Sequence, residues 1–209
     1  IRKLEKYSFS AIFHIAGQSS GEISFDDPVY DLQTNAQSTL LLLKLALKIG
    51  CQQFIYASTM SVYGDKPDMP VLENLELNPK SFYGVGKLAS EHYLRIYQEF
   101  GIISTAMRLF NVYGPGQNML NLRQGMVSIF LAQAIENKHI HVKGNADRYR
   151  DFIYIDDVIE AMLVVMDKQP KEYTTFNIAT GFSTTVGELI ELMKTNLPFE
   201  VTVEYTGST

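Results

Sequence analysis

The chain has 209 residues, of which 46% are hydrophobic and 20% charged, and its formal net charge is −5. This balance is typical of a folded globular protein and argues against a disordered one. The acidic charge argues against a general nucleic-acid-binding protein, which needs an excess of Lys and Arg, so any phosphate site must be local. The single cysteine, Cys51, excludes an internal disulfide framework and a Cys-based metal cluster.

Targeting signals and metal sites are absent from the sequence pattern. No apolar run reaches the roughly 18–20 residues of a membrane span, and the sequence starts without the basic-then-apolar order of a signal peptide. With the single cysteine, these features predict a cytoplasmic protein without a membrane partner. His92, His139 and His141 do not stand with carboxylates at metal-ligand spacing, so no catalytic metal is predicted.

The first half of the chain predicts strands and helices in alternation. Apolar runs predict the strands, and Gly50 and Gly101 follow the two helical stretches as C-caps. In chain order the expected elements are strand 11–16, helix 28–49, strand 54–57, a polar loop with Pro67, Pro70 and Pro79, a helix reaching about residue 100, and strand 105–109. This alternation indicates an α/β fold built on a doubly wound parallel sheet.

The pattern changes after Pro115, where a loop rich in Gly, Asn and Gln begins. The expected elements from there are helix 126–135, strand 139–143, a charged segment 145–150, a helix from Asp156, strand 175–178 and helix 185–196. The last helix begins with Thr185 as N-cap and Glu188 three residues later, which is the signature of a capping box.

Tyr83 and Lys87 are the first candidates for catalysis. Four residues apart on a helix, they project from the same face one turn apart. A tyrosine has an ordinary pKa of about 10, and a cation within about 4–6 Å lowers such a pKa by roughly 1–3 units. The spacing therefore predicts that Lys87 lowers the pKa of Tyr83 and makes it a base. By itself the spacing is weak evidence in a chain with 12 tyrosines.

The context of this pair strengthens the prediction. Ser58 and Thr59 follow the apolar strand 54–57 at its C-terminal end. Ligands of open parallel sheets bind at that end. A hydroxyl, a phenol and an ammonium are therefore expected in one site.

These residues resemble the extended short-chain dehydrogenase/reductase family, and within it the nucleotide-sugar epimerases and dehydratases. The resemblance runs through nearly the whole chain, in the segments His14–Gly17, Asn35, Tyr56–Gly64, Ser81–Lys87, Arg108–Pro115, Arg150–Val158 and Phe176–Gly181. It implies a Rossmann-type sheet, a nicotinamide cofactor, a nucleotide-sugar substrate and a homodimer. The sequence leaves NAD and NADP open, with NAD as the leading choice.

The resemblance also implies roles for individual residues. Tyr83 is the acid and base, Thr59 hydrogen-bonds the same sugar oxygen, and Lys87 also holds the nicotinamide ribose, a task that suits three ammonium donors. The implied cofactor contacts are Tyr83, Lys87, Ala16, Gly17, Asn35, Ser58 and Phe110.

The implied substrate contacts lie later in the chain. Besides Thr59, Asn111 binds the diphosphate and Arg150 binds a phosphate, for which a planar guanidinium is well shaped. Arg148 is the alternative candidate for this phosphate contact. One interpretation places Lys143 near the nucleotide base. The favoured interpretation is that Lys143 is a solvent-exposed residue at the end of a strand. His14 stands inside an apolar strand and is interpreted as a core histidine without a chemical role.

The residues after Thr59 depart from the dehydratases of the family. Those enzymes carry Asp-Glu, or at least Glu, at this place, because removal of water needs a further acid and base. This chain has Met60 and Ser61, neither of which is a carboxylic acid. The sequence therefore favours a 4-epimerase, with a UDP-hexose as the expected substrate. A 4,6-dehydratase or decarboxylase of the same fold and an inactive nucleotide-sugar-binding module are the alternatives.

A second departure concerns the glycine-rich dinucleotide fingerprint, which the sequence does not contain. The fifty or so residues that carry it in the family would precede Ile1, so the chain is expected to be part of a longer enzyme. Residues 1–115 are then the remainder of the dinucleotide-binding domain. Residues 116–209 form mainly the substrate lobe, and about 151–180 return to the first domain.

Overall fold

The computed structural model describes residues 3–65 and 70–207; Pro67 of the expected loop lies outside them. The chain divides into two compact units. The first contains the residues through Leu109 together with Val158–Ile178, and the second contains Phe110–Asp157 and the residues from Ala179 onward.

The first unit is built on a parallel sheet. Its strands are β1 (Ala11–His14), β2 (Gln53–Thr59), β3 (Ile103–Leu109) and β8 (Thr174–Ile178). They pair in the order β1-β2-β3-β8, and every pairing is parallel. This confirms the predicted doubly wound parallel sheet, and each predicted strand lies within one to two residues of an observed one.

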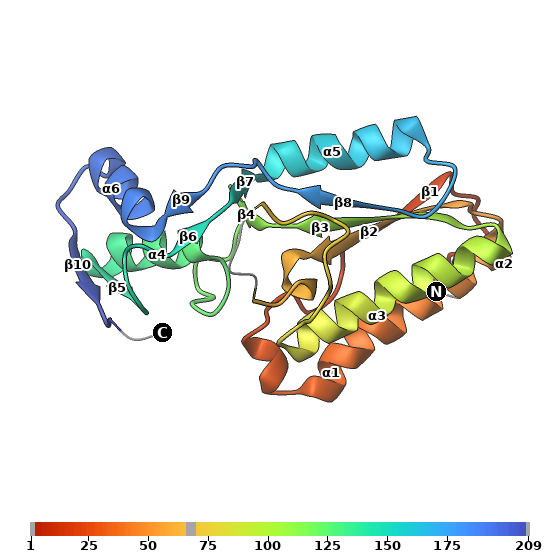
Figure 1. Ribbon diagram of the computed structural model, residues 1–209, viewed down its shortest axis with the longest axis horizontal. Coiled ribbons are helices and arrows are strands. Elements are labelled where there is room, and N and C mark those ends of the chain that lie inside the picture. Colours follow the sequence, from red (N-terminus) through yellow and green to blue (C-terminus); the bar gives the residue numbers. More distant parts are fainter. Residues whose placement is uncertain (1–2, 66–69, 208–209) are drawn as a thin grey trace. The chain divides into compact units, whose positions relative to one another are not determined.

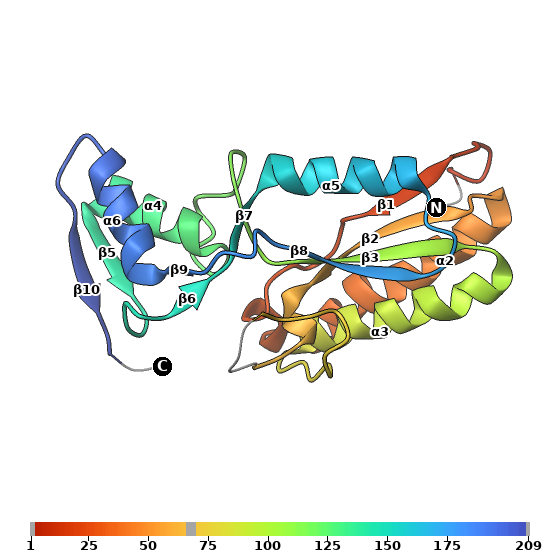
Figure 2. The same ribbon diagram turned by 45° about the horizontal axis from the view of Figure 1, so that its top comes forward.

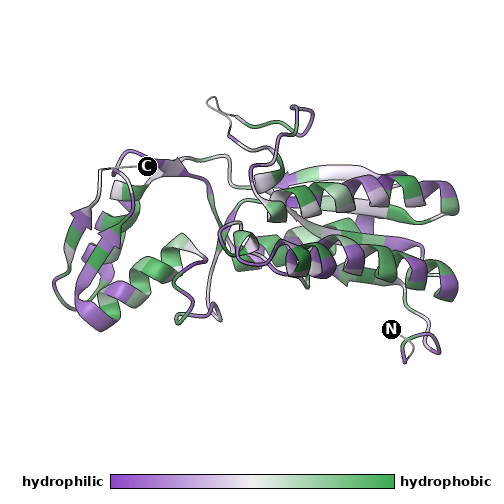
Figure 3. Cartoon of the chain, turned by 90° about the horizontal axis from the view of Figure 1, so that it is seen from below, coloured by the Kyte–Doolittle hydropathy of each residue, from purple (hydrophilic) through white to green (hydrophobic). Residues whose placement is uncertain are grey.

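Helices cover both faces of this sheet. Figures 1 and 2 show α2 (Ser38–Ile49) and α3 (Phe82–Tyr97) side by side on one face and α5 (Ile155–Lys168) on the other. Each helix carries both apolar and polar residues, which are visible as green and purple bands in Figure 3. The core between the α2 and α3 layer and the sheet contains Leu43, Phe54, Tyr56 and Leu94.

The predicted helix 28–49 is not a single α-helix. It consists of α1 (Pro28–Leu32), a π-helical segment (Gln33–Gln37) and α2. The hydroxyls of Ser38 and Thr39 both donate to the backbone carbonyl of Asn35, at 3.2 and 2.7 Å. Such side-chain bonds compete with the regular backbone ladder, and short π-segments are frequent at functional sites. Here the segment buries Asn35 completely.

The second unit contains short strand pairs and two helices. β4 (Asn111–Tyr113) pairs with β7 (Phe152–Tyr154), β5 (His139–Val142) with β10 (Thr202–Tyr205), and β6 (Tyr149–Arg150) with β9 (Thr184–Thr185). The helices are α4 (Met126–Asn137) and α6 (Val186–Asn196), and α6 has the predicted capping box. The sequence pattern misses β4, β6, β7, β9 and β10; all but β10 have only two or three residues, too few to show a period.

Short 3₁₀ segments complete the described chain: Ile23–Phe25, Met60–Val62 and Gln98–Phe100. No described helix is both long and apolar enough to cross a membrane.

Candidate active site

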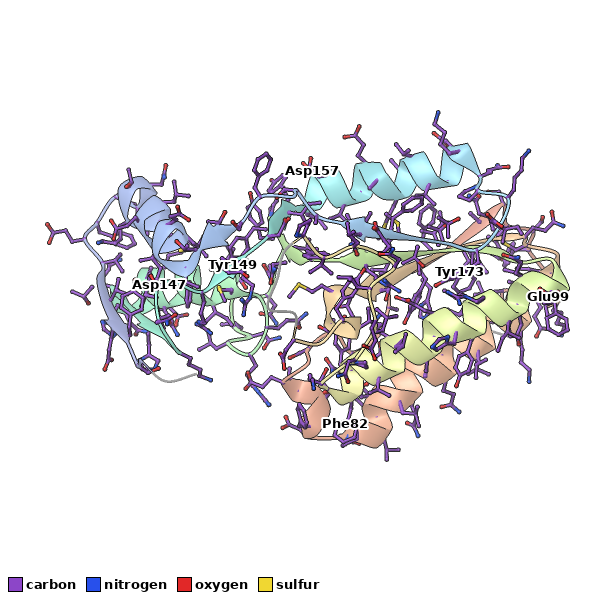
Figure 4. All side chains as sticks on the ribbon, in the orientation of Figure 1. Phe82, Glu99, Asp147, Tyr149, Asp157 and Tyr173 are labelled. Atoms are coloured by element: carbon purple, nitrogen blue, oxygen red, sulfur yellow. The ribbon has the colours of Figure 1, made fainter. Side chains whose placement is uncertain are left out.

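Lys87 is a residue of α3 whose side chain lies against β2. It is 3% exposed, and its ammonium nitrogen donates to the backbone carbonyl of Ala57 at 2.8 Å. The same nitrogen lies 4.8 Å from the ring centre of Tyr56 and 5.6 Å from that of Tyr83. Helix α3, labelled at its first residue Phe82 in Figure 4, thus presents Lys87 and Tyr83 to the same strand.

Thr59 and Tyr83 meet where β2 ends and α3 begins. Ser81 caps α3 by accepting from the backbone N–H of Gly84 at 3.1 Å, which fixes the helix start at Phe82, one residue before Tyr83. The Thr59 hydroxyl lies close enough to the Tyr83 phenol to lower the pKa of Tyr83. It also bonds the Ser61 backbone N–H and hydroxyl, both at 3.2 Å. The predicted hydroxyl, phenol and ammonium are therefore together.

The protonation of Tyr83 differs from the sequence-based expectation. Burial raises the pKa of Tyr83 to about 12, the hydrogen bond to Thr59 opposes this rise, and the negative charge of Asp31 adds to it. Burial lowers the pKa of Lys87 to about 8, against the opposing charge of Asp31. The predicted lowering of the Tyr83 pKa by Lys87 is thus wrong for this structure, because burial disfavours the phenolate more strongly than its surroundings favour it.

Gly17 and Asn35 form a small cradle. Gly17 has a φ of +151°, and a β-carbon there would lie 2.5 Å from the Asn35 Oδ1 atom. Asn35 Nδ2 donates to the backbone carbonyl of Gln18 at 3.0 Å, whereas its buried Oδ1 has no hydrogen-bond partner in the described structure. Exposed backbone beside an unpaired amide oxygen fits a ligand that carries hydroxyl donors, as a nicotinamide ribose does. Ala16 is exposed beside this cradle.

Ser58 belongs to a buried polar network that the sequence analysis missed. Its hydroxyl donates to Glu91 Oε1 at 2.5 Å, and Glu91 forms an ion pair with Arg108 at 2.7 Å in which both side chains are 4% exposed. The guanidinium also donates to the phenol oxygen of Tyr63 at 2.8 Å. Two sequence signals were available: Glu91 is four residues beyond Lys87, and Arg108 is a charge within an apolar strand.

His14 is a core histidine, as expected. It is 3% exposed, and its Nε2 atom lies 3.0 Å from the Thr39 hydroxyl. Burial, helped by the charge of Lys87, lowers the pKa of His14 to about 4.

Apart from Thr59, the candidate substrate residues lie in the second unit. Asn111 donates from its backbone and side-chain nitrogens to the carbonyl of Asp151, at 3.2 and 2.8 Å. The Asp151 carboxylate in turn accepts from the Thr180 backbone and hydroxyl and from the Gly181 backbone, at 2.7–2.9 Å. These bonds join Asn111, at the start of β4, to Asp151, and Asp151 to the segment at Thr180 and Gly181.

Arg150 is half-buried on β6, next to Tyr149, which Figure 4 labels. Its NH1 donates to the Tyr149 carbonyl at 2.7 Å, and burial together with the charge of Arg148 lowers the pKa of Arg150. The rival, Arg148, donates to the Lys143 carbonyl, while its buried Nε has no described partner. Lys143 itself is exposed just after β5.

Among the described residues, no group of three or more His, Cys, Asp or Glu side chains could hold a metal ion.

Comparison with known proteins decides the family. A model of the NAD-dependent epimerase/dehydratase family matches residues 1–179. This chain belongs to that family. The putative UDP-glucose 4-epimerase of Methanocaldococcus jannaschii is 32% identical over 200 residues, covering 93% of this chain and 64% of that protein. The UDP-glucose 4-epimerase of Mycolicibacterium smegmatis is 32% identical over 188 residues, covering 89% and 59%.

Solved structures of this family have the same fold. The UDP-glucose 4-epimerase of Thermotoga maritima, solved with UDP-glucose, superposes with a TM-score of 0.89 at 34% identity, over 98% of this chain and 67% of that one. The chain therefore spans about two thirds of the length of such relatives. This chain also matches proteins named dTDP-D-glucose 4,6-dehydratase and UDP-glucuronic acid decarboxylase, at 32% and 31% identity.

Proposed function

We propose that the complete protein catalyses the NAD-dependent epimerisation of a nucleotide sugar, at C4 of a UDP-hexose, through a transient 4-keto sugar. The observation that carries this proposal is the assembly of Thr59, Tyr83 and Lys87 at the C-terminal end of β2. Relatives named UDP-glucose 4-epimerase support the choice of substrate.

In the proposed reaction Tyr83 removes the proton from the sugar hydroxyl and later returns it, while Thr59 hydrogen-bonds the same oxygen. Lys87 supplies a nearby positive charge and donors for the cofactor ribose. NAD, when bound, supplies the acceptance and return of hydride at C4. A tyrosine pKa of about 12 means that the phenolate is scarce at neutral pH, so proton removal is most effective where positive charge collects beside Tyr83.

We assign the cofactor contacts to Ala16, Gly17, Asn35, Ser58 and Phe110, in addition to Tyr83 and Lys87. The cradle of Gly17 and Asn35 supports this assignment directly. Ser58 supports it less directly, because its hydroxyl is bonded to Glu91. The NAD dependence of the family favours NAD over NADP.

The residues after Thr59 favour an epimerase over a dehydratase. Met60 and Ser61 form the start of a 3₁₀ turn and provide no carboxylic acid next to Thr59. Elimination of water needs such a proton donor, whereas epimerisation needs only the proton exchange by Tyr83.

The reaction type is tested with the complete enzyme, UDP-glucose and NAD. We expect the C4 epimer, UDP-galactose, and no accumulated 4-keto-6-deoxy sugar, with products separated by chromatography and weighed by mass spectrometry. The deoxy product would make the protein a dehydratase. Release of carbon dioxide from UDP-glucuronic acid would make it a decarboxylase, and tight binding of UDP-glucose without any turnover would make it a binding module.

Arg150 is assigned to a substrate phosphate, with Asn111 and Lys143 as further substrate contacts. Arg150→Met in the complete enzyme should weaken binding of UDP by about 1.5–3 kcal/mol, the worth of a lost charge-assisted hydrogen bond. Isothermal titration calorimetry measures this. Lys194→Met removes an exposed charge from α6 of the same unit and serves as the control. Equal affinities of Arg150→Met and the unmodified enzyme would remove Arg150 from the site.

We also infer a homodimer and a cytoplasmic location. Exposed apolar side chains gather on the short segment before α1, on α1 and on α3: Phe25, Val29, Phe82 and Val85 are 46–63% exposed, and the rings of Phe25 and Phe82 are 5.4 Å apart. Such a surface is typical of a protein interface. Sedimentation velocity of the complete enzyme distinguishes a dimer from a monomer.

The buried, unpaired Cys51 is consistent with a reducing compartment.

A further inference from the structure

Asp31 is a buried acidic side chain that the proposed reaction does not use. It lies on α1 and is 1% exposed. Gln18 Nε2 donates to its Oδ2 atom at 2.8 Å and Asn35 Nδ2 donates to the same atom at 3.3 Å. Its other oxygen, Oδ1, is buried without a hydrogen-bond partner in the described structure. A buried carboxylate in this state needs a compensating positive charge.

The backbone of α3 makes room for this carboxylate beside the candidate active site. A β-carbon on Gly86, the residue before Lys87, would lie 3.4 Å from Asp31 Oδ1. That is an ordinary van der Waals distance, so the Asp31 carboxylate packs against the backbone of α3 at this glycine. The carboxylate thus lies against α3 at the residue that precedes Lys87 in the sequence.

We propose that Asp31 is a positioning residue of the candidate active site, whose buried carboxylate is the fixed counter-charge that keeps Lys87 in its ammonium form beside Tyr83. Burial raises the pKa of Asp31, whereas the hydrogen bonds from Asn35 and Gln18 and the charge of Lys87 oppose that rise and favour the ionised carboxyl group. The catalytic consequence rests on the proposed function, but the assignment of the charge does not.

The other groups around Lys87 do not supply this charge. Tyr56 on β2 and Tyr83 on α3 present aromatic rings, and burial raises the pKa of both phenols. His14 on β1 has its pKa lowered to about 4 and is neutral at physiological pH. Glu91, the next acidic residue along α3, is paired with Arg108. Asp31 is the anion that acts on Lys87, and it opposes the lowering of the Lys87 pKa by burial.

Asp31 raises the pH at which Tyr83 and Lys87 together lose a proton, whichever of these two side chains gives it up. With both protons bound, Tyr83 and Lys87 together carry a charge of +1, and after losing one proton they are neutral overall. A fixed negative charge favours the +1 form. Without it the pair loses its proton at a lower pH.

The test follows Lys87 directly by NMR. In the complete enzyme labelled with ¹³C- and ¹⁵N-lysine, the Lys87 side-chain signal is identified by its absence from Lys87→Met and is followed as a function of pH. We expect Asp31→Asn to move the titration midpoint down by about 1 unit, the lower end of the shift that a nearby opposite charge causes in proteins. Asp27→Asn, which removes an exposed carboxylate from the N-cap of the same helix, should leave the midpoint unchanged.

A folded Asp31→Asn enzyme with an unchanged midpoint overturns the proposal. If that variant does not fold by circular dichroism, Gln18→Leu replaces it. Loss of one donor to Oδ2 disfavours the anion and should lower the midpoint by a smaller amount, and an unchanged midpoint there overturns the proposal equally. A purely structural role of Asp31 would change stability without moving this midpoint.

The same variants separate this proposal from the proposed function. In an active epimerase, the alkaline fall of kcat/KM should move to lower pH in Asp31→Asn, together with the midpoint. A shifted midpoint in a protein that does not epimerise any UDP-hexose would leave the role of Asp31 standing and refute the activity.

Discussion

Tyr83→Phe in the complete enzyme is expected to lower turnover by about 100-fold or more and to leave the affinity for the nucleotide sugar nearly unchanged. The substitution removes one oxygen atom and keeps the ring that lies 5.6 Å from the Lys87 ammonium. The lost hydroxyl acts in proton transfer, which takes place in the transition state, so the loss should appear in kcat rather than in binding. Steady-state kinetics and calorimetry with UDP-glucose measure the two effects separately.

Tyr56→Phe is the matched control for this experiment. Tyr56 is buried like Tyr83, and its ring lies even closer to the Lys87 ammonium, at 4.8 Å. It has no part in the proposed proton transfer, so Tyr56→Phe should keep most of the turnover. Retention of most activity by Tyr83→Phe, or equal losses in both variants, would show that Tyr83 is not the acid and base.

Glu91→Ala is expected to lower the free energy of unfolding by about 3–5 kcal/mol, because it leaves the Arg108 guanidinium buried without its partner. Two hydrogen bonds join these side chains, at 2.7 and 3.0 Å, and a third runs from the Ser58 hydroxyl to Glu91. Urea unfolding of the complete enzyme, followed by circular dichroism, measures the difference.

The control is Glu191→Ala on α6. Glu191 pairs with Lys194 at 2.8 Å, but the two side chains are 69% and 38% exposed. An ion pair in water contributes less than about 1 kcal/mol. Similar losses of unfolding free energy in the two variants would mean that the buried pair of Glu91 and Arg108 stabilises the protein no more than an exposed pair does.

The sequence by itself determined the strand and helix order of the first unit. Apolar runs are clear signals where a strand is buried on both faces, as in β2 and β3, and Gly50 and Gly101 end their segments in the left-handed conformation expected of C-caps. The sequence also determined the residue types of the candidate site, because the four-residue spacing of Tyr83 and Lys87 fixes their common helix face.

Tertiary structure decided what the environment does to those residues. The pKa of Tyr83 follows from burial, which depends on every segment packed around it and which a local spacing cannot reveal. Partners distant in the chain were equally hidden: Glu91 meets Arg108 and Ser58, and Asp31 comes to lie beside Gly86 because the fold packs α1 against α3. Local patterns specify helices and strands, whereas charge, burial and pairing belong to the packed chain.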